Sequence, residues 1–556
     1  MTKVYNFAQM FHLQPALIVR RVGKSLLAGM MSVCLYAAGP AVVEAQNLPE
    51  NLVSSDKSGD LSERYHPASM SFAPCAENPH LECGRLTLPV DYSKPSGDKF
   101  DLAVARARAT KPHQRIGVLL ALPGGPGLSG VDFLLGAGNS PTLIRLLERF
   151  DVVSFDPRGA GRSRPVSCEF EGENFPADPS DEALAAFFDN FGRRFARACL
   201  TQNGNFIKSL GTNNVARDMD ALRRALGEEQ ISYVGISYAT VLGAVYSSLF
   251  PQRVRAMVLD GGVAPEFEDY FVESWSEFST GFERAFQRLD QLCRRDPACR
   301  LQTPSVVAVF DEVAARLKAA PVTSPEGVVL SNNELADIIS ALLSGEENWP
   351  LIVDALAEAR GADYSILFQV LSLIPPSNDA VFPFFCNDYG TRRPASEYLP
   401  VDEAVGALNP RFFGRFFVAS ATARCTAWPK AEAPLIQNVK NRVSTPILLV
   451  GNDFDPNTHL AGTRSLAHAL GMDRTIIRYQ GGGHTAVGVS ACIDDAVVAY
   501  LLNLTVPAEG FSCPAQPIGF GPPATQHAIT AGRTASEVNR QSFWGPRPPR
   551  IRKLHQ

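Results

Sequence analysis

Apolar and polar positions change their spacing several times along this chain. After residue 85, short apolar runs at 116–122, 151–155, 231–234 and 254–259 end at glycine, proline or aspartate, as buried strands do. Stretches with helical periodicity separate these runs. Because strands buried on both faces read as continuous apolar runs, this order predicts a mostly parallel sheet covered by helices on both faces.

The helix before the third strand has the clearest periodicity. Val215, Met219 and Leu222 fall on one helical face, and Gly227 follows as a stop signal. Thr212 stands where an N-cap is expected, because its hydroxyl can accept a hydrogen bond from an N–H of the first turn.

The pattern changes between about 265 and 440. Strand-like runs vanish there, and apolar residues recur at helical spacing, as Phe282 and Phe286 do. Strand-like runs then return at 446–450 and 475–479. A sheet that is interrupted by a helical block and then resumed predicts one α/β domain with an inserted helical lid.

The predicted organisation therefore has six parts. The last is expected to be disordered, because it is rich in Pro, Gly and Arg and lacks periodicity. The parts are a signal peptide (1–45), an N-terminal extension (46–85), the first part of the core (86–265), the helical lid (266–440), the second part of the core (441–513) and the tail (514–556).

The N-terminus predicts export. Arg20, Arg21 and Lys24 form a basic region, an apolar run covers 26–43, and Val43-Glu44-Ala45 resembles a signal-peptidase site. The alternative is a retained membrane anchor, but Gly39-Pro40 interrupts a run that is barely long enough to span a bilayer. We expect cleavage after about Ala45, a periplasmic or secreted protein, and no stable membrane span afterwards.

Composition and charge narrow the class of protein further. The 556 residues are 45% hydrophobic and 20% charged, with a formal net charge of −5. These values are typical of a soluble globular protein and point to no nucleic-acid partner. They do not predict an oligomeric state.

Eleven cysteines agree with export. Cys34 lies in the predicted signal, and the other ten form an even set, as expected in an oxidising compartment. No Cys or His spacing indicates a metal site. Many pairings are possible, and pairing in sequence order is expected because it closes short loops: Cys75–Cys83, Cys168–Cys199, Cys293–Cys299, Cys386–Cys425 and Cys492–Cys513.

Ser237 is the candidate nucleophile. It stands in Gly235-Ile236-Ser237-Tyr238-Ala239, directly after a strand and before an apolar helix. Such a turn projects the serine Oγ above a sheet and leaves room only for small residues two positions on either side, as Gly235 and Ala239 are. The helix that follows also directs its positive end toward developing negative charge.

Two backbone N–H groups are expected to stabilise the oxyanion. One belongs to Tyr238, and the other comes from the Pro-Gly-Gly-Pro-Gly loop at 123–127, where Gly125 is favoured and Gly124 is second. A nucleotide-phosphate loop is disfavoured, because no lysine follows the glycines. No cofactor is expected.

The base and its orienting acid are expected after the last two strands. His484 follows three glycines at a strand end, and Asp455 is favoured over Asp453 as the acid that fixes its tautomer. Asp260, at the fourth strand end, is expected to be a structural acceptor. The segment at 156–163, Asp-Pro-Arg-Gly-Ala-Gly-Arg-Ser, is expected to be a loop braced by an Asp/Arg pair.

Together these motifs resemble the prolyl-iminopeptidase family of α/β-hydrolases. The resemblance covers about 70 to 515 and is greatest to the secreted tripeptidyl-aminopeptidase-like branch, which has the patterns seen here in Asp455-Pro456-Asn457-Thr458 and Gly483-His484-Thr485. It implies the α/β-hydrolase fold, the Ser237, Asp455 and His484 triad, and export. Ala239 and His459 depart from the family's usual glycine and proline.

The resemblance implies a serine hydrolase, and we expect an aminopeptidase acting on peptide N-termini. Its lid would bind the substrate's ammonium group through a carboxylate. The candidates are Glu266, Glu268, Asp269 and Asp388. An alternative is a carboxylesterase or amidase acting on a small non-peptide substrate, for which four lid aromatics would suit: Phe267, Phe271, Phe278 and Phe282. A non-catalytic binding protein on the same fold is a second alternative.

Overall fold

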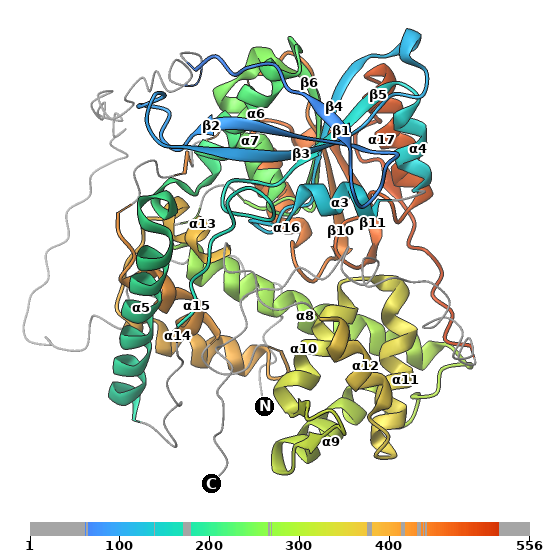
Figure 1. Cartoon of the computed structure of the whole chain (residues 1–556). Helices are drawn as coiled ribbons and strands as arrows, with labels where there is room; N and C mark the ends of the chain where they lie inside the picture. Colours follow the sequence, from blue (N-terminus) through green and yellow to red (C-terminus); the bar gives the residue numbers. More distant parts are fainter. Residues whose placement is uncertain are drawn as a thin grey trace, which may run out of the picture. The chain divides into compact units, whose positions relative to one another are not determined.

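The computed structural model in Figure 1 describes Ser62 and most of residues 65–521. The predicted signal peptide and most of the predicted tail lie outside the described residues. Also outside are 138–139, 171–179, 265–266, 268, 375–380, 413–416, 431–434, 437–438 and 440–441.

Within the described chain, ten strands form one sheet in the order β1-β2-β3-β5-β4-β6-β7-β10-β11-β12. From β5 to β12 all neighbours pair in parallel, whereas β1, β2, β3 and β5 pair antiparallel at one edge. The mostly parallel sheet agrees with the apolar runs of the sequence. The strands are β1 (Phe72–Pro74), β2 (Glu82–Pro89), β3 (Lys99–Ala107), β4 (Gly117–Leu122), β5 (Phe150–Phe155), β6 (Ile231–Ile236), β7 (Val254–Asp260), β10 (Leu448–Phe454), β11 (Ile476–Gly482) and β12 (Ser512–Cys513).

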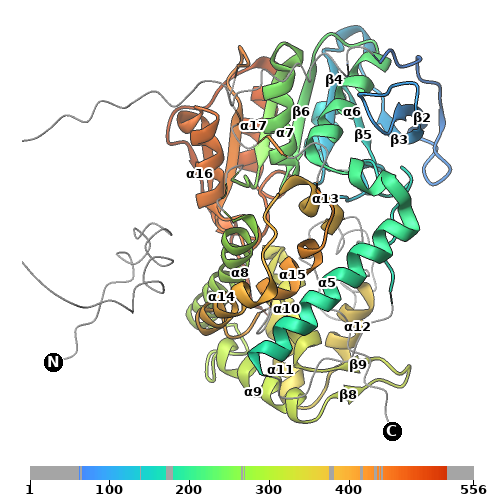
Figure 2. The ribbon, with the colours of Figure 1, turned by 90° about the vertical axis from the view of Figure 1, so that its left-hand side faces the viewer.

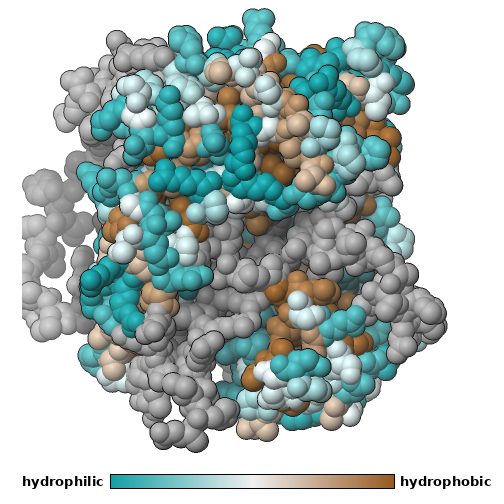
Figure 3. Space-filling view, in the orientation of Figure 1, coloured by the Kyte–Doolittle hydropathy of each residue, from teal (hydrophilic) through white to brown (hydrophobic). Residues whose placement is uncertain are grey.

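Strands β2 and β3 are missing from the sequence prediction. The predicted boundary between the N-terminal extension and the core, at 85/86, falls inside β2, which pairs with β3 along its whole length. Several positions of both strands are exposed, so neither reads as a continuous apolar run. Figure 3 shows hydrophilic residues over this edge of the sheet.

Helices lie on both sides of the strands (Figure 2), and each face of the sheet has its own apolar core. The two cores fill the space between the strands and two sets of helices, as the continuous apolar strands require. One face carries α3 (Gly130–Gly136), α4 (Pro141–Leu147) and α17 (Ala491–Asn503), and the other carries α6 (Thr212–Ala225), α7 (Ala239–Leu249) and α16 (Leu460–Ala469).

Helix α6 begins one residue earlier than the sequence suggests. Gly211 is its N-cap, so the expectation that Thr212 caps it is wrong. Thr212 is instead the first helical residue, and its hydroxyl bonds to the side chains of Tyr238 and Asp388. Gly227 follows the helix with φ +76°, a conformation suited to glycine.

The remaining helices form the lid. Helices α9 to α12 and the later part of α8 have a core of their own, which includes Phe286 and Trp349. The buried side chains of α5, α13, α14 and α15 instead join the core on one face of the sheet. Helix α5 lies between β5 and β6 in sequence but packs on α14 and α15, so the helical part is larger than the predicted span of 266–440. The lid elements are α5 (Asp181–Asn203), α8 (Tyr270–Arg295), α9 (Val306–Ala319), β8 (Val322–Thr323), β9 (Val329–Leu330), α10 (Asn332–Leu343), α11 (Trp349–Arg360), α12 (Ser365–Leu373), α13 (Val381–Asp388), α14 (Ala395–Leu408) and α15 (Phe417–Thr426).

Five disulfides join the ten described cysteines in the pairs expected from the sequence. Cys386–Cys425 links α13 to α15, and Cys293–Cys299 closes the end of α8.

Among the helices that the structure describes, none combines the length and the apolar character that crossing a membrane requires.

The first residues of the predicted tail pack against the lid. Phe520 is buried in the lid core, and its N–H donates to Asp296 at 3.1 Å. The N–H of Gln516 donates to the hydroxyl of Tyr479 at 3.0 Å. The described part of the tail, 514–521, therefore connects the last core strand to the lid.

Candidate active site

Ser237 lies on a tight turn between β6 and α7. Its φ of +59° is unusual for a residue with a side chain, and its N–H donates to the carbonyl of Asp260 at 2.8 Å. A Cβ at Gly235 would lie 2.5 Å from the carbonyl oxygen of Ala239, so the turn needs glycine at that position. The chain thus holds a strained serine at the carboxyl edge of the sheet, as the sequence predicts.

The glycine-rich loop after β4 packs directly on this turn. A Cβ at Gly124 would lie 2.4 Å from the carbonyl oxygen of Ile236 and 3.1 Å from the N atom of Tyr238. Gly124 and Gly125 have φ values of +99° and +110°, which strongly favour glycine. The expected second oxyanion donor, Gly125, lines the same pocket as Ser237 and Tyr238.

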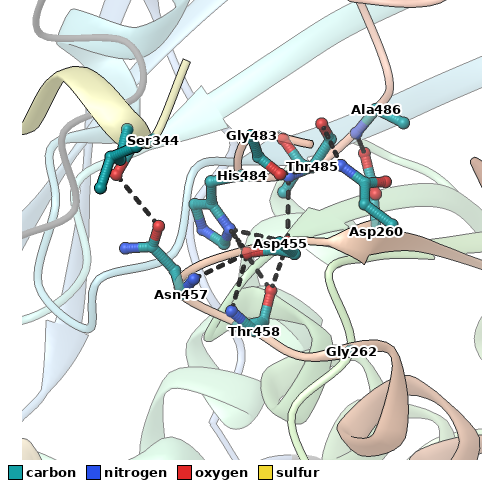
Figure 4. A network of polar contacts seen from close by, with 12 residues as sticks. Asp260, Gly262, Ser344, Asp455, Asn457, Thr458, Gly483, His484, Thr485 and Ala486 are labelled. Carbon is teal, nitrogen blue, oxygen red and sulfur yellow. Dashed lines mark hydrogen bonds and ion pairs between the residues drawn. The ribbon is translucent and has the colours of Figure 1, made fainter. Parts of the chain in front are cut away.

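Asp455 and His484 meet below Ser344 of the lid, as Figure 4 shows. Both carboxylate oxygens of Asp455 lie 3.1 Å from Nδ1 of His484, and both residues are buried. The hydroxyl of Thr458 donates to the same carboxylate at 2.9 Å. The acid and the base favoured by the sequence are therefore in direct contact.

Three backbone N–H groups also donate to Asp455. Those of Asn457 and Thr458 donate at 2.8 Å, and that of Thr485 donates at 3.2 Å. Burial by itself would raise the pKa of this carboxyl, but the charge of His484 and these hydrogen bonds hold the pKa below its ordinary value. Asp455 is thus kept as a carboxylate beside the imidazole.

Asp453 and Asp260, which also lie at strand ends, have different partners. Asp453 pairs with Arg478 through two bonds of 2.5 and 2.6 Å at the surface. Asp260 is buried and accepts hydrogen bonds from the N–H groups of Ala486 and Val487 at 2.9 and 2.8 Å. Asp260 therefore holds the loop that follows His484, and neither aspartate has a bond to the imidazole among the described contacts.

The Asp-Pro-Arg-Gly segment braces the site from outside. Asp156 accepts hydrogen bonds from the Ser129 hydroxyl at 2.6 Å and from the Val131 N–H at 2.9 Å, which fixes the chain just after the glycine-rich loop. The expected Asp/Arg pair forms between Asp156 and Arg162, at 3.8 Å, and Arg158 has a different partner. It is fully buried and forms a bidentate ion pair with Asp218 on α6, with bonds of 2.6 and 2.8 Å.

A pocket opens above Ser237 between the turn and the lid. Its empty volume is about 620 Å³, which includes space open to solvent. Apolar and aromatic side chains predominate, and no charged residue lines it among the described residues. Of the four lid aromatics expected to suit an aromatic substrate, Phe278 is in this lining. Phe271 and Phe282 are buried in the cores. Phe267 packs against Tyr270.

None of the candidate carboxylates for amine recognition that the structure describes lies in the pocket. Glu266 and Glu268 lie outside the described residues. Asp269 caps α8 and pairs with Arg393 at 3.4 Å. Asp388 is buried and accepts two hydrogen bonds from Thr212, at 2.8 and 2.6 Å. Neither described aspartate lines the pocket.

Asp388 instead supports the side chain that follows the serine. The Tyr238 hydroxyl bonds to the Thr212 hydroxyl, which in turn donates to Asp388. Burial raises the pKa of Asp388 to about 7, against the effect of its bonds to Thr212. Burial, and then the charge of Asp388, raises the pKa of Tyr238 well above its ordinary value, so the phenol stays neutral.

Sequence reasoning missed the lid residues that contact the acid and base loops. Ser344 donates its hydroxyl to Asn457 at 3.0 Å, and Glu346 accepts from the N–H of Gly482 at 2.9 Å. The one signal available was the run of three glycines before His484, which indicates that another part of the chain approaches closely. Among the described residues, no group of three or more His, Cys, Asp or Glu side chains is placed to hold a metal ion.

Comparisons with known proteins identify relatives of this chain. A family model described as TAP-like protein matches residues 410–513. Serine protease Hip1 of Mycobacterium tuberculosis is 31% identical over 80% of this chain and 91% of its own length. Tripeptidyl aminopeptidase of Streptomyces lividans is 30% identical over 78% of this chain and 83% of its own.

A third relative has a different name. Carboxylesterase B of Mycobacterium tuberculosis is 32% identical over 78% of this chain and 86% of its own length. These relatives span the sheet and the lid alike, and they confirm both the family and the α/β-hydrolase fold that the motifs suggested. This chain belongs to the TAP-like family of α/β-hydrolases and is a serine hydrolase.

Proposed function

We propose that this serine hydrolase is an exported aminopeptidase that cleaves peptides near their N-terminus through an acyl-enzyme on Ser237. The observation that carries the proposal is the buried contact between Asp455 and His484 at the sheet edge where the strained Ser237 turn also lies. The relatives named serine protease and tripeptidyl aminopeptidase support a peptide substrate.

In the proposed reaction, Ser237 Oγ attacks the substrate carbonyl while His484 takes its proton through Nε2. The N–H groups of Tyr238 and Gly125 stabilise the oxyanion. His484 then gives the proton to the leaving amine, which departs and leaves an ester on Ser237. Water attacks this ester with His484 again as the base, and the acid is released as Ser237 recovers its proton.

The electrostatics of the site fit this sequence of steps. The pKa of Asp455 is held low by His484 and by hydrogen bonds, in spite of burial, so the carboxylate is charged when the imidazolium forms. Helix α7 begins two residues after Ser237, at Ala239, and directs the positive end of its dipole toward the oxyanion. Both effects favour the charged transition state over the neutral ground state.

The pocket beside Ser237 suits an apolar group on the acyl side of the scissile bond. Burying apolar surface against such walls is favourable by roughly 25 cal/mol for each Å². The lining residues available to the substrate are Val241, Val263, Tyr270, Ser274, Trp275, Phe278, Val381, Phe385 and Tyr389.

We assign recognition of the free amine to Glu277. It lies on the same face of α8 as the pocket residues Tyr270 and Ser274, seven and three positions further along the helix. Glu277 is open to solvent and is not among the residues that line the pocket, so it would contact the ammonium group at the pocket's rim. Partial desolvation, and then the charge of Glu273, raise its pKa, and the positive charge of a bound ammonium group would offset both effects by favouring the carboxylate.

The second candidate function is a carboxylesterase acting on an apolar ester. The lack of charged residues among the described pocket lining favours it, and so does the relative named Carboxylesterase B. The same triad and oxyanion donors would serve, but a free amine would not be needed.

The two functions are separated by kinetics on matched substrates. We expect a peptide anilide with a free amine to be cleaved at least tenfold faster, by kcat/KM, than its N-acetylated form. Glu277→Gln should reduce this preference, whereas Glu403→Gln, at an exposed position of α14, should keep it. Equal rates for free and blocked anilides, with faster turnover of aryl esters, would support the carboxylesterase instead.

Export is supported by the five disulfides, because such bonds persist in oxidising compartments. We expect the mature protein in the periplasm or the culture medium, with an N-terminus near Gln46. Fractionation and N-terminal sequencing would check this, and a full-length chain found only in the cytoplasm would contradict it.

A further inference from the structure

The segment that joins α10 to α11, together with the first residue of α11 (344–349), contacts the loops of both the acid and the base. We call it the lid tip, and it contains the short helix η6 (Glu346–Asn348). We propose that the lid tip positions the catalytic acid and base, with Ser344 and Glu346 as positioning residues. This inference rests on the proposed roles of Asp455 and His484.

The base loop is bound to the lid tip through backbone atoms. The N–H of His484 itself donates to the carbonyl of Ser344 at 2.7 Å. A Cβ at Gly483 would lie 3.0 Å from the N atom of Glu346, and one at Gly482 would lie 2.5 Å from the ring of Trp349. Gly482 and Gly483 are therefore required by the close approach of the lid.

Glu346 adds a second pair of bonds on this side. Its buried carboxylate accepts from the N–H of Gly482 at 2.9 Å and from the hydroxyl of Tyr479 at 3.1 Å. No ion pair of Glu346 occurs among the described residues, and burial raises its pKa in spite of these bonds. A buried carboxylate held by neutral donors is costly, so its presence is better explained by positioning than by stability.

The acid loop is bound by the same segment. The Ser344 hydroxyl donates to the side-chain oxygen of Asn457 at 3.0 Å, and the N–H of Asn457 donates to Asp455 at 2.8 Å. Figure 4 shows Ser344 beside both loops. One lid residue therefore contacts the base through its carbonyl and the acid loop through its hydroxyl.

A consequence is that lid position and triad geometry are coupled. Moving α10 and α11 away from the sheet would break the bonds at Ser344 and Glu346 together. Because no lid-tip residue is among those that line the pocket, displacing the lid tip would disturb the acid and base without itself opening the pocket.

The test compares lid-tip variants with matched controls on a small substrate. Ser344→Ala removes the bond to Asn457, and its control is Ser340→Ala, a buried serine of α10 whose hydroxyl bonds within its own helix. Glu346→Ala removes the bonds to Gly482 and Tyr479, and its control is Glu347→Ala at the exposed neighbouring position. Turnover of an aryl acetate and the rate of fluorophosphonate labelling report on the triad without a peptide.

We expect kcat on the aryl acetate, and the labelling rate, to fall about tenfold or more in both lid-tip variants, with KM little changed. Glu346→Gln should recover part of the loss, because its amide oxygen still accepts from Gly482. Both controls should keep the activity of the unmodified chain. If either lid-tip variant folds and keeps full kcat, or loses activity only through KM, the inference is wrong for that residue.

Failure of the proposed function would look different. An unmodified chain that reacts with aryl acetate and fluorophosphonate but cleaves no peptide would contradict the aminopeptidase and leave this test intact. An unmodified chain that does not label at all would contradict the triad. If Glu346→Ala does not fold, Ser344→Ala and Glu346→Gln still decide the outcome.

Discussion

Nδ1 of His484 lies 3.1 Å from both carboxylate oxygens of Asp455. With the imidazole proton on Nδ1, this contact directs Nε2 away from the acid as the available base. Thr458 donates its hydroxyl to the same carboxylate at 2.9 Å, so the acid is held from a second side. The tautomer of the histidine therefore depends on the charge of Asp455.

Replacing Asp455 by Asn should remove that charge and permit the wrong tautomer. We expect kcat to fall by roughly 10³ to 10⁴-fold with little change in KM. The control is Asp453→Asn, which breaks the surface pair with Arg478 and should leave kcat within about twofold of the unmodified chain. Steady-state kinetics on a free-amine anilide would measure both, and a loss below tenfold for Asp455→Asn would contradict its role.

Gly124→Ala should disrupt the turn that carries the serine. The new Cβ would lie 2.4 Å from the carbonyl oxygen of Ile236, at a φ of +99°. Gly327→Ala is a matched control, because its φ is +83° but nothing lies within 4 Å of its Cβ. Both variants carry backbone strain of about 1–3 kcal/mol, so the melting temperature should fall in both. Only Gly124→Ala should lose activity, with kcat falling about 100-fold. Equal kcat in the two variants would argue against this packing.

Asp260 should make stability depend on pH. Burial, against two backbone hydrogen bonds, raises its pKa to about 7 in the folded state from 3.8. Between these values the folded state binds more protons than the unfolded state, so this group's stabilising contribution is lost as pH rises, by up to roughly 1.4 kcal/mol for each pH unit. Asp260→Asn should remove this decline. Denaturant unfolding at pH 5 and pH 7 gives the free energy of unfolding of both proteins. If this free energy falls between the two pH values as much in Asp260→Asn as in the unmodified chain, the prediction is wrong.

His459 should make the folded state less stable as pH falls, which is the opposite of the effect of Asp260. Burial, and then the charge of Arg284, lower the pKa of His459 to about 4 from 6.5. The unfolded state therefore binds more protons between pH 4 and pH 6.5, and stability is lost as pH falls through this window. His459→Pro should reduce the acid-induced loss, because the backbone there has a φ of −60° that proline adopts readily. Melting temperatures measured from pH 7 to pH 4 would show the difference between the two proteins. If the melting temperature falls as steeply in His459→Pro as in the unmodified chain, the prediction is wrong.

The sequence predicted the parallel strands and the residues at their ends because each depends on local chemistry. Ser237 follows a buried strand within a run of small residues, and His484 follows glycines at another strand end, so each is visible within a few positions. Strands β2 and β3 were missed because their exposed positions break up the apolar runs that the other strands show. The sequence favours Thr212 as a cap because it cannot distinguish a hydroxyl that bonds to its own helix from one that bonds to Asp388.

The lid contacts could not be predicted in the same way. Ser344 lies 113 positions from Asn457, and Glu346 lies 136 positions from Gly482, so no local pattern records either contact. A serine at a helix end and a glutamate after it are ordinary surface residues by sequence. Only the three-dimensional packing of the lid against the sheet brings them to the acid and base loops.

The role of Ser237 as the nucleophile is tested most directly by reacting the purified protein with a fluorophosphonate and locating the adduct by peptide mapping. We expect one adduct, on the peptide that contains Ser237, formed in parallel with loss of activity and absent in Ser237→Ala. An adduct on a different residue, or labelling that persists unchanged in Ser237→Ala, would contradict the assignment.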